Sequence, residues 1–192
     1  MRNFCITGLL LLASALCFGQ APKSAFYTSS SDVFVGYMAT FPDYGTSFYS
    51  LRFNGAEVAY SKALTRRWSV IAAGDGVFGS YFDVRQYSGT VGPKFNFLIG
   101  NIRPYATVQA GFAYQNSDHM YAFDHHPHLN EKYRDIEDGF SYRAGLGGDV
   151  QLSRHIYWRA IQWDVQPQPW ARHIPVYENF SSGIGYSFQG KY

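Results

Sequence analysis

The stretch Phe140–Val165, FSYRAGLGGDVQLSRHIYWRAIQWDV, decides the class of fold. From Phe140 to Gln151, mostly apolar residues at even-numbered positions alternate with polar or small residues at odd-numbered positions. This period of two is that of a β-strand with one apolar and one polar face. The short link Leu152–His155 follows, and a second apolar segment begins at Ile156. The stretch therefore predicts a β-hairpin.

The second strand of this hairpin, Ile156–Val165, breaks the simple alternation. Arg159 stands at an odd-numbered position and Gln162 and Asp164 at even-numbered ones, so a regular strand cannot place all three on one face. A β-bulge near Ala160–Ile161 inserts one extra residue and returns the three polar side chains to the same side. We predict such a bulge.

Six further segments alternate in the same way, which gives eight strands. Their apolar faces begin at Val33, Ala56, Trp68, Val91, Ala106 and Phe180. The links between strands alternate in length: the short links are Lys62–Arg67, Leu98–Arg103 and Leu152–His155, and the long ones are Phe41–Phe53, Gly79–Ser88, Gln115–Asp138 and Gln166–Glu178. Short turns at one end and long loops at the other are typical of membrane barrels. The predicted fold is all-β, an eight-stranded antiparallel up-and-down transmembrane β-barrel.

The composition agrees with a single β domain. The 192 residues are 46% hydrophobic, 19% aromatic and only 16% charged, with a formal net charge of +2 and a mean hydropathy of −0.22. Disordered chains are rich in charge and poor in aromatic residues, and nucleic-acid-binding domains carry a strong basic excess, so both classes are excluded. Helical bundles are excluded because they favour Ala, Leu, Glu and Lys over Tyr, Phe and Gly.

The residues on the polar face indicate which face is inside. A water-soluble barrel has its charges outside, whereas a membrane barrel has an apolar outer band and a polar interior, the lumen. Here the polar face carries small residues and isolated charges, which suit a narrow lumen filled by side chains. We predict an internal ion-pair network of Glu57, Asp75, Lys94, Arg143, Asp149, Arg159 and Asp164. We also predict aromatic girdles at the membrane interfaces, formed by Trp68, Phe97, Tyr114, Phe140, Trp163, Phe180 and Phe188.

The N-terminal segment has the pattern of a secretory signal peptide. Arg2 precedes a largely apolar run, Phe4–Phe18, which is shorter than the roughly 20 residues of a membrane-spanning helix. We expect residues 1–19 to be removed, residues 20–30 to form a periplasmic segment and residues 31–192 to form the barrel. Both cysteines, Cys5 and Cys17, lie in the removed part, so no disulfide is expected. The expected location is the bacterial outer membrane, reached by export.

The segment Arg143–Arg159 resembles the Gly-rich strand, Ser-Arg-His turn and Arg-bearing strand of uncharacterised barrel proteins, especially those of soil acidobacteria. Gly92-Pro93-Lys94 and Arg103-Pro104-Tyr105-Ala106 resemble their fourth and fifth strands. As a pattern, residues 30–188 are similar to the small bacterial outer-membrane β-barrel family that includes OmpA-like transmembrane domains. The aromatic last strand resembles the C-terminal recognition signal of such barrels. The resemblance implies a fold and a compartment, and it transfers no catalytic residue.

The long link Gln115–Asp138 is unusually rich in histidine. It contains His119, His125, His126 and His128 among six carboxylates. Imidazole and carboxylate groups suit Zn²⁺, Cu²⁺ or Ni²⁺, so weak metal binding is one interpretation. A solvated polar loop that happens to be rich in histidine is the other, and the spacing matches no closed structural zinc site. No cofactor is expected.

We expect no catalytic site and no enzymatic activity. The loop histidines have no evident serine partner, His155 lies in a short turn, and the charges of the polar face are explained by ion pairing, because desolvated charges must be paired. The expected role is structural, in membrane integrity, or interaction at the cell surface. The alternatives are a narrow passive pore and, less favoured, a lipid-modifying enzyme of the outer membrane.

Aromatic residues in the long links have two interpretations. They bind a surface ligand, or they pack on one another above the membrane. These residues are Phe41, Tyr44, Phe48, Tyr49, Tyr81, Phe82, Tyr87, Tyr121, Phe123, Tyr133, Trp170 and Tyr177. The expected partners are outer-membrane lipid and lipopolysaccharide, together with a surface ligand for the outer loops. No nucleic acid is expected, and the barrel is expected to be a monomer.

Overall fold

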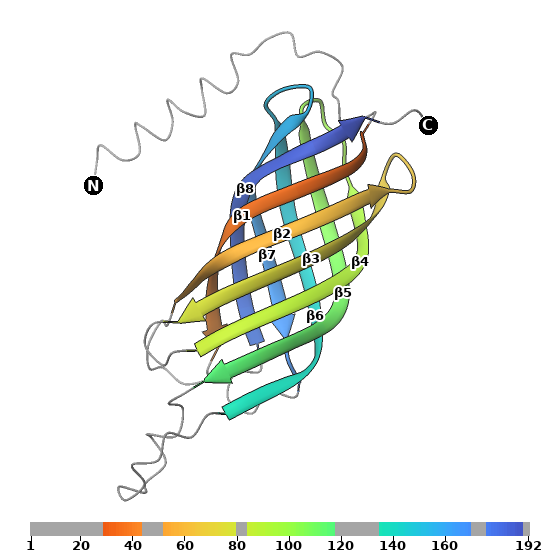
Figure 1. Ribbon diagram of the computed structural model, residues 1–192. Coiled ribbons are helices and arrows are strands. Elements are labelled where there is room, and N and C mark those ends of the chain that lie inside the picture. The colour runs from red at the N-terminus through yellow and green to blue at the C-terminus, as the bar shows by residue number, and fades with distance from the viewer. Residues whose placement is uncertain (1–28, 44–51, 80–83, 118–134, 170–175, 190–192) are drawn as a thin grey trace, which may run out of the picture.

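The protein forms a closed barrel of eight antiparallel strands in chain order (Figure 1). The structure is a computed structural model that describes residues 29–43, 52–79, 84–117, 135–169 and 176–189. The strands are β1 Ser29–Asp43, β2 Phe53–Ala63, β3 Trp68–Gly79, β4 Val84–Asn96, β5 Ile102–Ser117, β6 Asp135–Gln151, β7 Ile156–Pro167 and β8 Val176–Gln189. Pairing of β1 with β8 closes the barrel. The predicted up-and-down topology is confirmed. In the described part of the chain, no helix has the length and apolar character needed to cross a bilayer.

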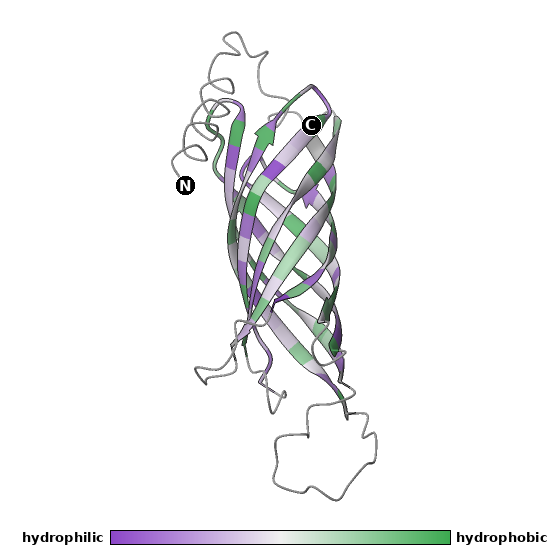
Figure 2. Ribbon diagram, turned by 90° about the vertical axis from the view of Figure 1, so that its left-hand side faces the viewer, coloured by the Kyte–Doolittle hydropathy of each residue, from purple (hydrophilic) through white to green (hydrophobic). Residues whose placement is uncertain are grey.

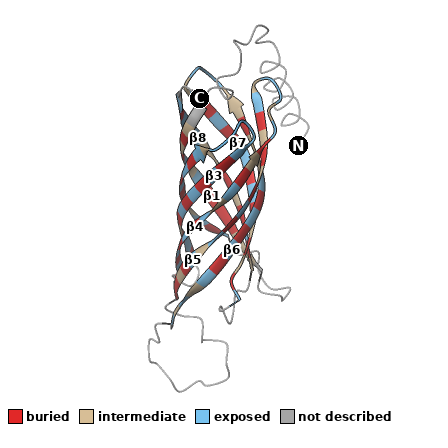
Figure 3. Ribbon diagram, turned by 90° about the vertical axis from the view of Figure 1, so that its right-hand side faces the viewer, coloured by how far each residue is buried: buried red, intermediate tan, exposed pale blue. Residues whose placement is uncertain are grey.

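Side chains alternate between the lumen and the outer surface along the strands. In β3, the outward Trp68 and Val70 are 48% and 38% exposed, whereas the inward Ser69 and Ile71 are 7% and 0% exposed. Figure 3 shows buried and exposed residues alternating along the strands, and Figure 2 shows the mixed hydropathy that accompanies this alternation. The face that the sequence identifies as apolar is thus the outer face.

The lumen is not polar throughout. Phe34, Ile71 and Tyr157 belong to one buried apolar cluster, and Phe53 and Tyr177 belong to a second. The inward charges therefore lie among apolar side chains, where unpaired charge is costly.

The bulge predicted in β7 is present. The pairing of β6 with β7 skips Ala160, and the pairing of β7 with β8 shifts register between Arg159 and Gln162. As a result, Arg159, Gln162 and Asp164 all point into the lumen, and each is 0% exposed.

The three short turns lie at the end of the barrel where β1 begins and β8 ends, the upper end in Figure 1. This end is called the turn end below, and the opposite end is called the loop end. The turns comprise residues 64–67, 97–101 and 152–155.

At the loop end the strands extend further than the sequence analysis predicts. β6 begins at Asp135, inside the long link expected there, and β8 begins at Val176. Tyr177 therefore belongs to β8 and is 0% exposed in the lumen, so its assignment to an outer loop is wrong. Phe41 and Tyr87 likewise lie in β1 and β4. Polar residues such as Gln115 suggest a loop in the sequence, but here they fill the lumen of a wall that continues past them.

Candidate functional site

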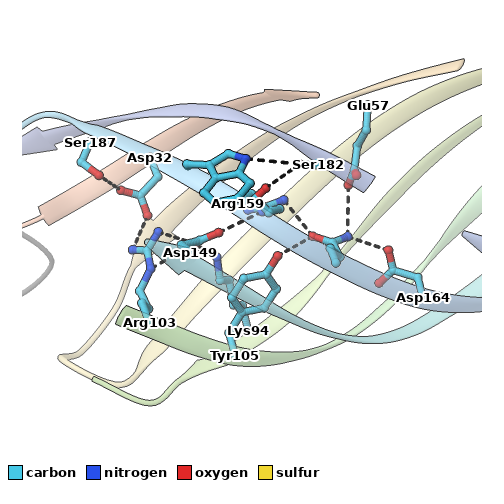
Figure 4. Close-up of polar contacts among 12 residues, drawn as sticks. Asp32, Glu57, Lys94, Arg103, Tyr105, Asp149, Arg159, Asp164, Ser182 and Ser187 are labelled. Atoms are coloured by element: carbon cyan, nitrogen blue, oxygen red, sulfur yellow. Dashed lines mark hydrogen bonds and ion pairs between the residues drawn. The ribbon is translucent and has the colours of Figure 1, made fainter. Parts of the chain in front are cut away.

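The lumen near the turn end is organised around Asp149 in β6 (Figure 4). This carboxylate accepts hydrogen bonds from Arg103, with Nη2 at 2.8 Å and Nε at 3.2 Å, and from Arg159 Nε at 3.0 Å. Lys94 Nζ lies 3.4 Å from Asp149 Oδ2. Arg103 Nη1 also donates to Asp32 Oδ2 at 2.7 Å. These five residues, from β1, β4, β5, β6 and β7, form the Asp149 cluster.

The second group of charges lies around Arg143, further toward the loop end. Arg143 Nη1 lies 3.4 Å from Glu57 Oε1, and Arg143 Nη2 donates to Asp75 Oδ1. Ser88 Oγ donates to the same Asp75 oxygen at 2.6 Å. Together with Asp164, the residues Glu57, Asp75 and Arg143 form the Arg143 cluster.

Gln162 connects the two clusters. Its Oε1 accepts hydrogen bonds from Arg159 Nη1 at 2.8 Å and from the Tyr105 hydroxyl at 2.6 Å. Its Nε2 donates to Asp164 Oδ2 at 2.6 Å and lies 3.4 Å from Glu57 Oε1. The bulge in β7 is what allows Gln162 to face the lumen beside Arg159, so this connection depends on it.

The eighth strand joins the network through a hydroxyl. Ser187 Oγ donates to Asp32 Oδ1 at 2.7 Å. All eight strands therefore contribute at least one side chain to a single set of hydrogen bonds and ion pairs. Each inserted side chain links its own strand to strands elsewhere in the wall.

The two clusters carry unequal charge. The Asp149 cluster contains three cations and two carboxylates, whereas the Arg143 cluster contains three carboxylates and one guanidinium. One oxygen of each carboxylate in the Arg143 cluster is buried without a hydrogen-bond partner: Glu57 Oε2, Asp75 Oδ2 and Asp164 Oδ1. A low local dielectric makes such atoms costly. The Arg143 cluster is thus the less completely paired of the two.

Aromatic rings cover the cations of the Asp149 cluster. The Arg159 guanidinium carbon lies 3.8 Å from the centre of the Phe34 ring, and Lys94 Nζ lies 3.8 Å from the centre of the Tyr105 ring. These contacts have the geometry of cation–π interactions, which are strongest where water is excluded. Tyr105 reaches this position because Gly147 opposite it has no side chain; a Cβ there would overlap the ring.

The central charges of the network are buried. Arg143, Asp149, Arg159 and Glu57 are each 0% exposed. An open channel would leave charged groups in contact with water, so burial of these four side chains favours a lumen filled by side chains where they lie.

The structure brings together all seven charged residues that the sequence analysis assigned to the lumen. Six of them are in ion pairs, and Asp164 is bound by the Gln162 amide. Sequence reasoning missed Asp32 and Arg103, although Arg103 makes two of the shortest contacts in the Asp149 cluster, to Asp32 at 2.7 Å and to Asp149 at 2.8 Å. The alternation along each strand could have identified both residues. Asp32 lies two positions before the inward Phe34, and Arg103 lies two positions before the inward Tyr105, so each shares the inward face.

The residues predicted as interface girdles lie on the outer surface at both ends of the barrel. Trp68, Phe97, Phe140, Trp163 and Phe188 are 38–60% exposed, whereas Tyr114 and Phe180 are half-buried. Several meet other aromatic rings. At the turn end, Phe95 contacts both Trp68 and Phe97 with ring centres 4.7 and 4.8 Å apart. At the loop end, Phe140 lies 4.5 Å from Phe112.

The candidate metal ligands His119, His125, His126 and His128 lie outside the described residues. Within the described ranges, no group of three or more His, Cys, Asp or Glu side chains is arranged to hold a metal ion. His155, in the turn between β6 and β7, stacks on Tyr186 with ring centres 5.4 Å apart, and its Nδ1 lies 3.1 Å from the carbonyl oxygen of Ser187.

The chain is similar in structure to small outer-membrane barrels. Neisserial surface protein A matches with a TM-score of 0.64 at 11% identity, over 83% of this chain and 98% of that one. The attachment invasion locus protein Ail of Yersinia pestis matches with a TM-score of 0.56 at 16% identity, over 83% and 99%. The outer membrane protein OprG of Pseudomonas aeruginosa matches with a TM-score of 0.54 at 13% identity, over 88% and 100%.

No protein-family model matches the chain, and no curated protein matches its sequence. At these identities the structural likeness concerns the fold. The chain therefore has the fold of the small eight-stranded outer-membrane β-barrels, the OmpA-like type that the sequence pattern predicts.

Proposed function

We propose that this chain spans the bacterial outer membrane as a closed barrel, and that its role is structural or interaction-based rather than catalytic. The observation that carries the proposal is the filled lumen, in which the buried Asp149 and Arg143 clusters are joined by Gln162. A barrel filled in this way gives the membrane a rigid element and supports loops at one end without opening a route through the bilayer.

The outer surface supports the membrane assignment. Large apolar side chains at mid-barrel are more than half exposed, among them Val58 at 53%, Val108 at 63% and Ile184 at 53%. Soluble monomers rarely expose continuous apolar surface on this scale. An apolar outer band between two aromatic girdles is the pattern that lipid requires of a β-barrel.

Planar-bilayer recording tests the sealed lumen directly. The refolded barrel is expected to produce no stepwise conductance at moderate voltage, because an ion would have to displace fully buried, paired side chains. An open porin reconstituted in the same bilayer serves as the positive control. Steady single-channel steps from the parent protein would favour the alternative function, a narrow passive pore.

The compartment and orientation are tested together by fractionation and surface proteolysis. The protein is expected in the outer-membrane fraction, and protease added to intact cells is expected to cut within residues 118–134, in the longest link at the loop end. We propose that these outer loops face the cell exterior and are the part that meets a surface ligand or lipopolysaccharide. Recovery of the protein in the soluble periplasm would contradict the whole assignment.

A further inference from the structure

Two of the short turns share a sequence pattern. Leu64-Thr65-Arg66-Arg67-Trp68 connects β2 to β3, and Leu152-Ser153-Arg154-His155-Ile156 connects β6 to β7. Each begins with Leu, continues with a hydroxyl residue, an arginine and a second basic or imidazole residue, and ends on a large apolar residue. The two turns are four strands apart in an eight-stranded closed barrel, so they lie on opposite sides of the turn end.

The two turns also share three hydrogen bonds. In the first, the amides of Leu64 and Thr65 donate to the carbonyl of Trp68 at 2.9 and 3.0 Å, and the Thr65 hydroxyl accepts from the Trp68 amide at 3.0 Å. In the second, the amides of Leu152 and Ser153 donate to the carbonyl of Ile156, both at 3.0 Å.

The Ser153 hydroxyl completes the match by accepting from the Ile156 amide at 3.2 Å. These shared bonds place Arg66 and Arg154 at the same position of the same turn. The turns differ at the next residue, where Arg67 is exposed and His155 is half-buried against Tyr186. Each turn thus presents at least one exposed arginine at its tip.

Each turn presents an apolar side chain next to its cations. Leu64 is 63% exposed and Leu152 is 60% exposed, and both continue the apolar outer band to the tip of the turn. Arg66, Arg67 and Arg154 are exposed immediately beyond them. An aliphatic residue followed by arginine is what the boundary between hydrocarbon and headgroup favours, because the arginine can extend its charge outward from apolar surface.

The charge of the turn end has one sign. Among the described residues, its exposed charged side chains are Lys62, Arg66, Arg67 and Arg154, all cationic. The acidic side chains of this end, Asp32 and Asp149, are buried and paired inside the lumen. At the loop end, by contrast, exposed residues of both signs occur, namely Arg52, Arg85, Asp138 and Glu178.

We infer that the two matching turns are binding sites for anionic phospholipid headgroups in the leaflet at the turn end, one lipid at each turn. The arginine fork donates to the headgroup phosphate, and the exposed leucine lies against the first carbons of the acyl chains. Charge complementarity and continuity with the lipid-facing band both point to this ligand. The inference rests on the proposed membrane-spanning barrel, but not on whether the lumen conducts.

Native mass spectrometry of the refolded barrel measures the sites directly. The protein is released from detergent micelles that contain equal amounts of phosphatidylglycerol and phosphatidylcholine, and the lipids that it retains are counted. The parent is expected to retain up to two phosphatidylglycerol molecules in preference to phosphatidylcholine. The variants R66Q/R67Q and R154Q are each expected to retain one fewer, and the combined variant none.

Two controls make the result specific. R66K/R67K preserves the charge and is expected to retain two lipids. Arg52→Gln removes an exposed arginine at the loop end, where Arg52 Nη2 donates to the Tyr37 hydroxyl at 2.7 Å, and is expected to leave the count unchanged. A heat-modifiable gel shift confirms that each variant is folded.

Three outcomes would overturn the inference. The parent could retain both lipids equally, or the glutamine variants could retain as much phosphatidylglycerol as the parent. In the third outcome, the parent cosediments with isolated peptidoglycan and the combined variant does not, although the combined variant still retains two lipids. That result would assign the cations to the cell-wall polymer. A conducting parent with intact lipid retention would instead contradict the proposed function alone.

Discussion

Two adjacent glycines in β6 face opposite sides of the barrel wall. Gly147 points inward at Tyr105, and a Cβ built on it would overlap the Tyr105 ring. This ring covers Lys94, and its hydroxyl donates a hydrogen bond to Gln162. Gly148 points outward, and a Cβ there meets nothing within 4 Å. The packing of Tyr105 therefore requires glycine at position 147, whereas position 148 has room for a side chain.

Alanine substitution separates these two positions. Gly147→Ala is expected to cost about 1–3 kcal/mol of unfolding free energy, because it overpacks a filled lumen. Gly148→Ala is the matched control and is expected to change stability by no more than about 0.5 kcal/mol. Urea unfolding in liposomes, followed by tryptophan fluorescence, measures both. Equal losses at the two glycines would show that the Tyr105 contact does not matter.

Two of the three carboxylates around Arg143 are expected to contribute unequally to the free energy of unfolding. Asp75 is bound by Arg143 and by Ser88, so Asp75→Asn removes the main counter-charge of a buried guanidinium and is expected to cost about 3–5 kcal/mol. Asp164 accepts a hydrogen bond from the Gln162 side-chain amide. The side-chain oxygen of an asparagine can still accept this bond, so Asp164→Asn is expected to cost about 1 kcal/mol or less. The same unfolding assay ranks them, and a larger loss for Asp164→Asn would contradict the pairing described here.

At the level of the strand, the bulge at Ala160 sets the direction of every residue after it in β7. Deleting Ala160 removes the extra residue, so that a regular ladder still places Arg159, Gln162 and Asp164 on the same inward face. We therefore expect the deletion variant to keep the heat-modifiable gel shift of a folded barrel. Ala160→Ser keeps the bulge and is the matched control. Loss of the gel shift on deletion alone would mean that the bulge itself, and not only the alignment of these side chains, is required for folding.

Sequence alternation predicted the faces of the strands and even the bulge. In a barrel wall with one apolar side, a period of two determines which residues face inward and which face outward. The alternation was less informative at the loop end. There β5 ends after its expected end, and β6 and β8 begin before their expected starts. The alternation did not reveal this because inward positions are polar, as at Gln115 in β5, or aromatic, as at Tyr177 in β8, and such a pattern resembles a loop. Which charges pair could not be predicted from one strand. Asp32 and Arg103 meet across the lumen, 71 residues apart in sequence, and only the closed barrel brings them together.

For the whole molecule, the barrel is expected to be independent of its longest link. Ser117 and Asp135 are paired at the ends of β5 and β6, so a short turn can replace residues 118–134 without disturbing the ladder. The excised variant is expected to retain the gel shift and to unfold within about 1 kcal/mol of the parent. Failure to fold would mean that the link contributes to the core.

The same variant tests the histidine cluster. Because it lacks His119, His125, His126 and His128, it is the matched control for equilibrium dialysis of the parent against Zn²⁺. Zinc retained by the parent and lost on excision would support the metal interpretation of that link. Equal retention by the two proteins would support the solvated-loop interpretation.

The contacts that seal the lumen join distant parts of the chain. Gln162 and Glu57 are 105 residues apart, and Ser187 and Asp32 are 155 residues apart. Contacts of such high sequence separation form late and slowly, because loop-closure entropy opposes them. None of the bonds to Asp32 from β8 can exist until the last strand has docked on the first. A partly assembled sheet would expose bare charges and unpaired strand edges to hydrocarbon, which lipid does not tolerate. We therefore expect insertion into the membrane, closure of the barrel and pairing of the charges to be kinetically coupled.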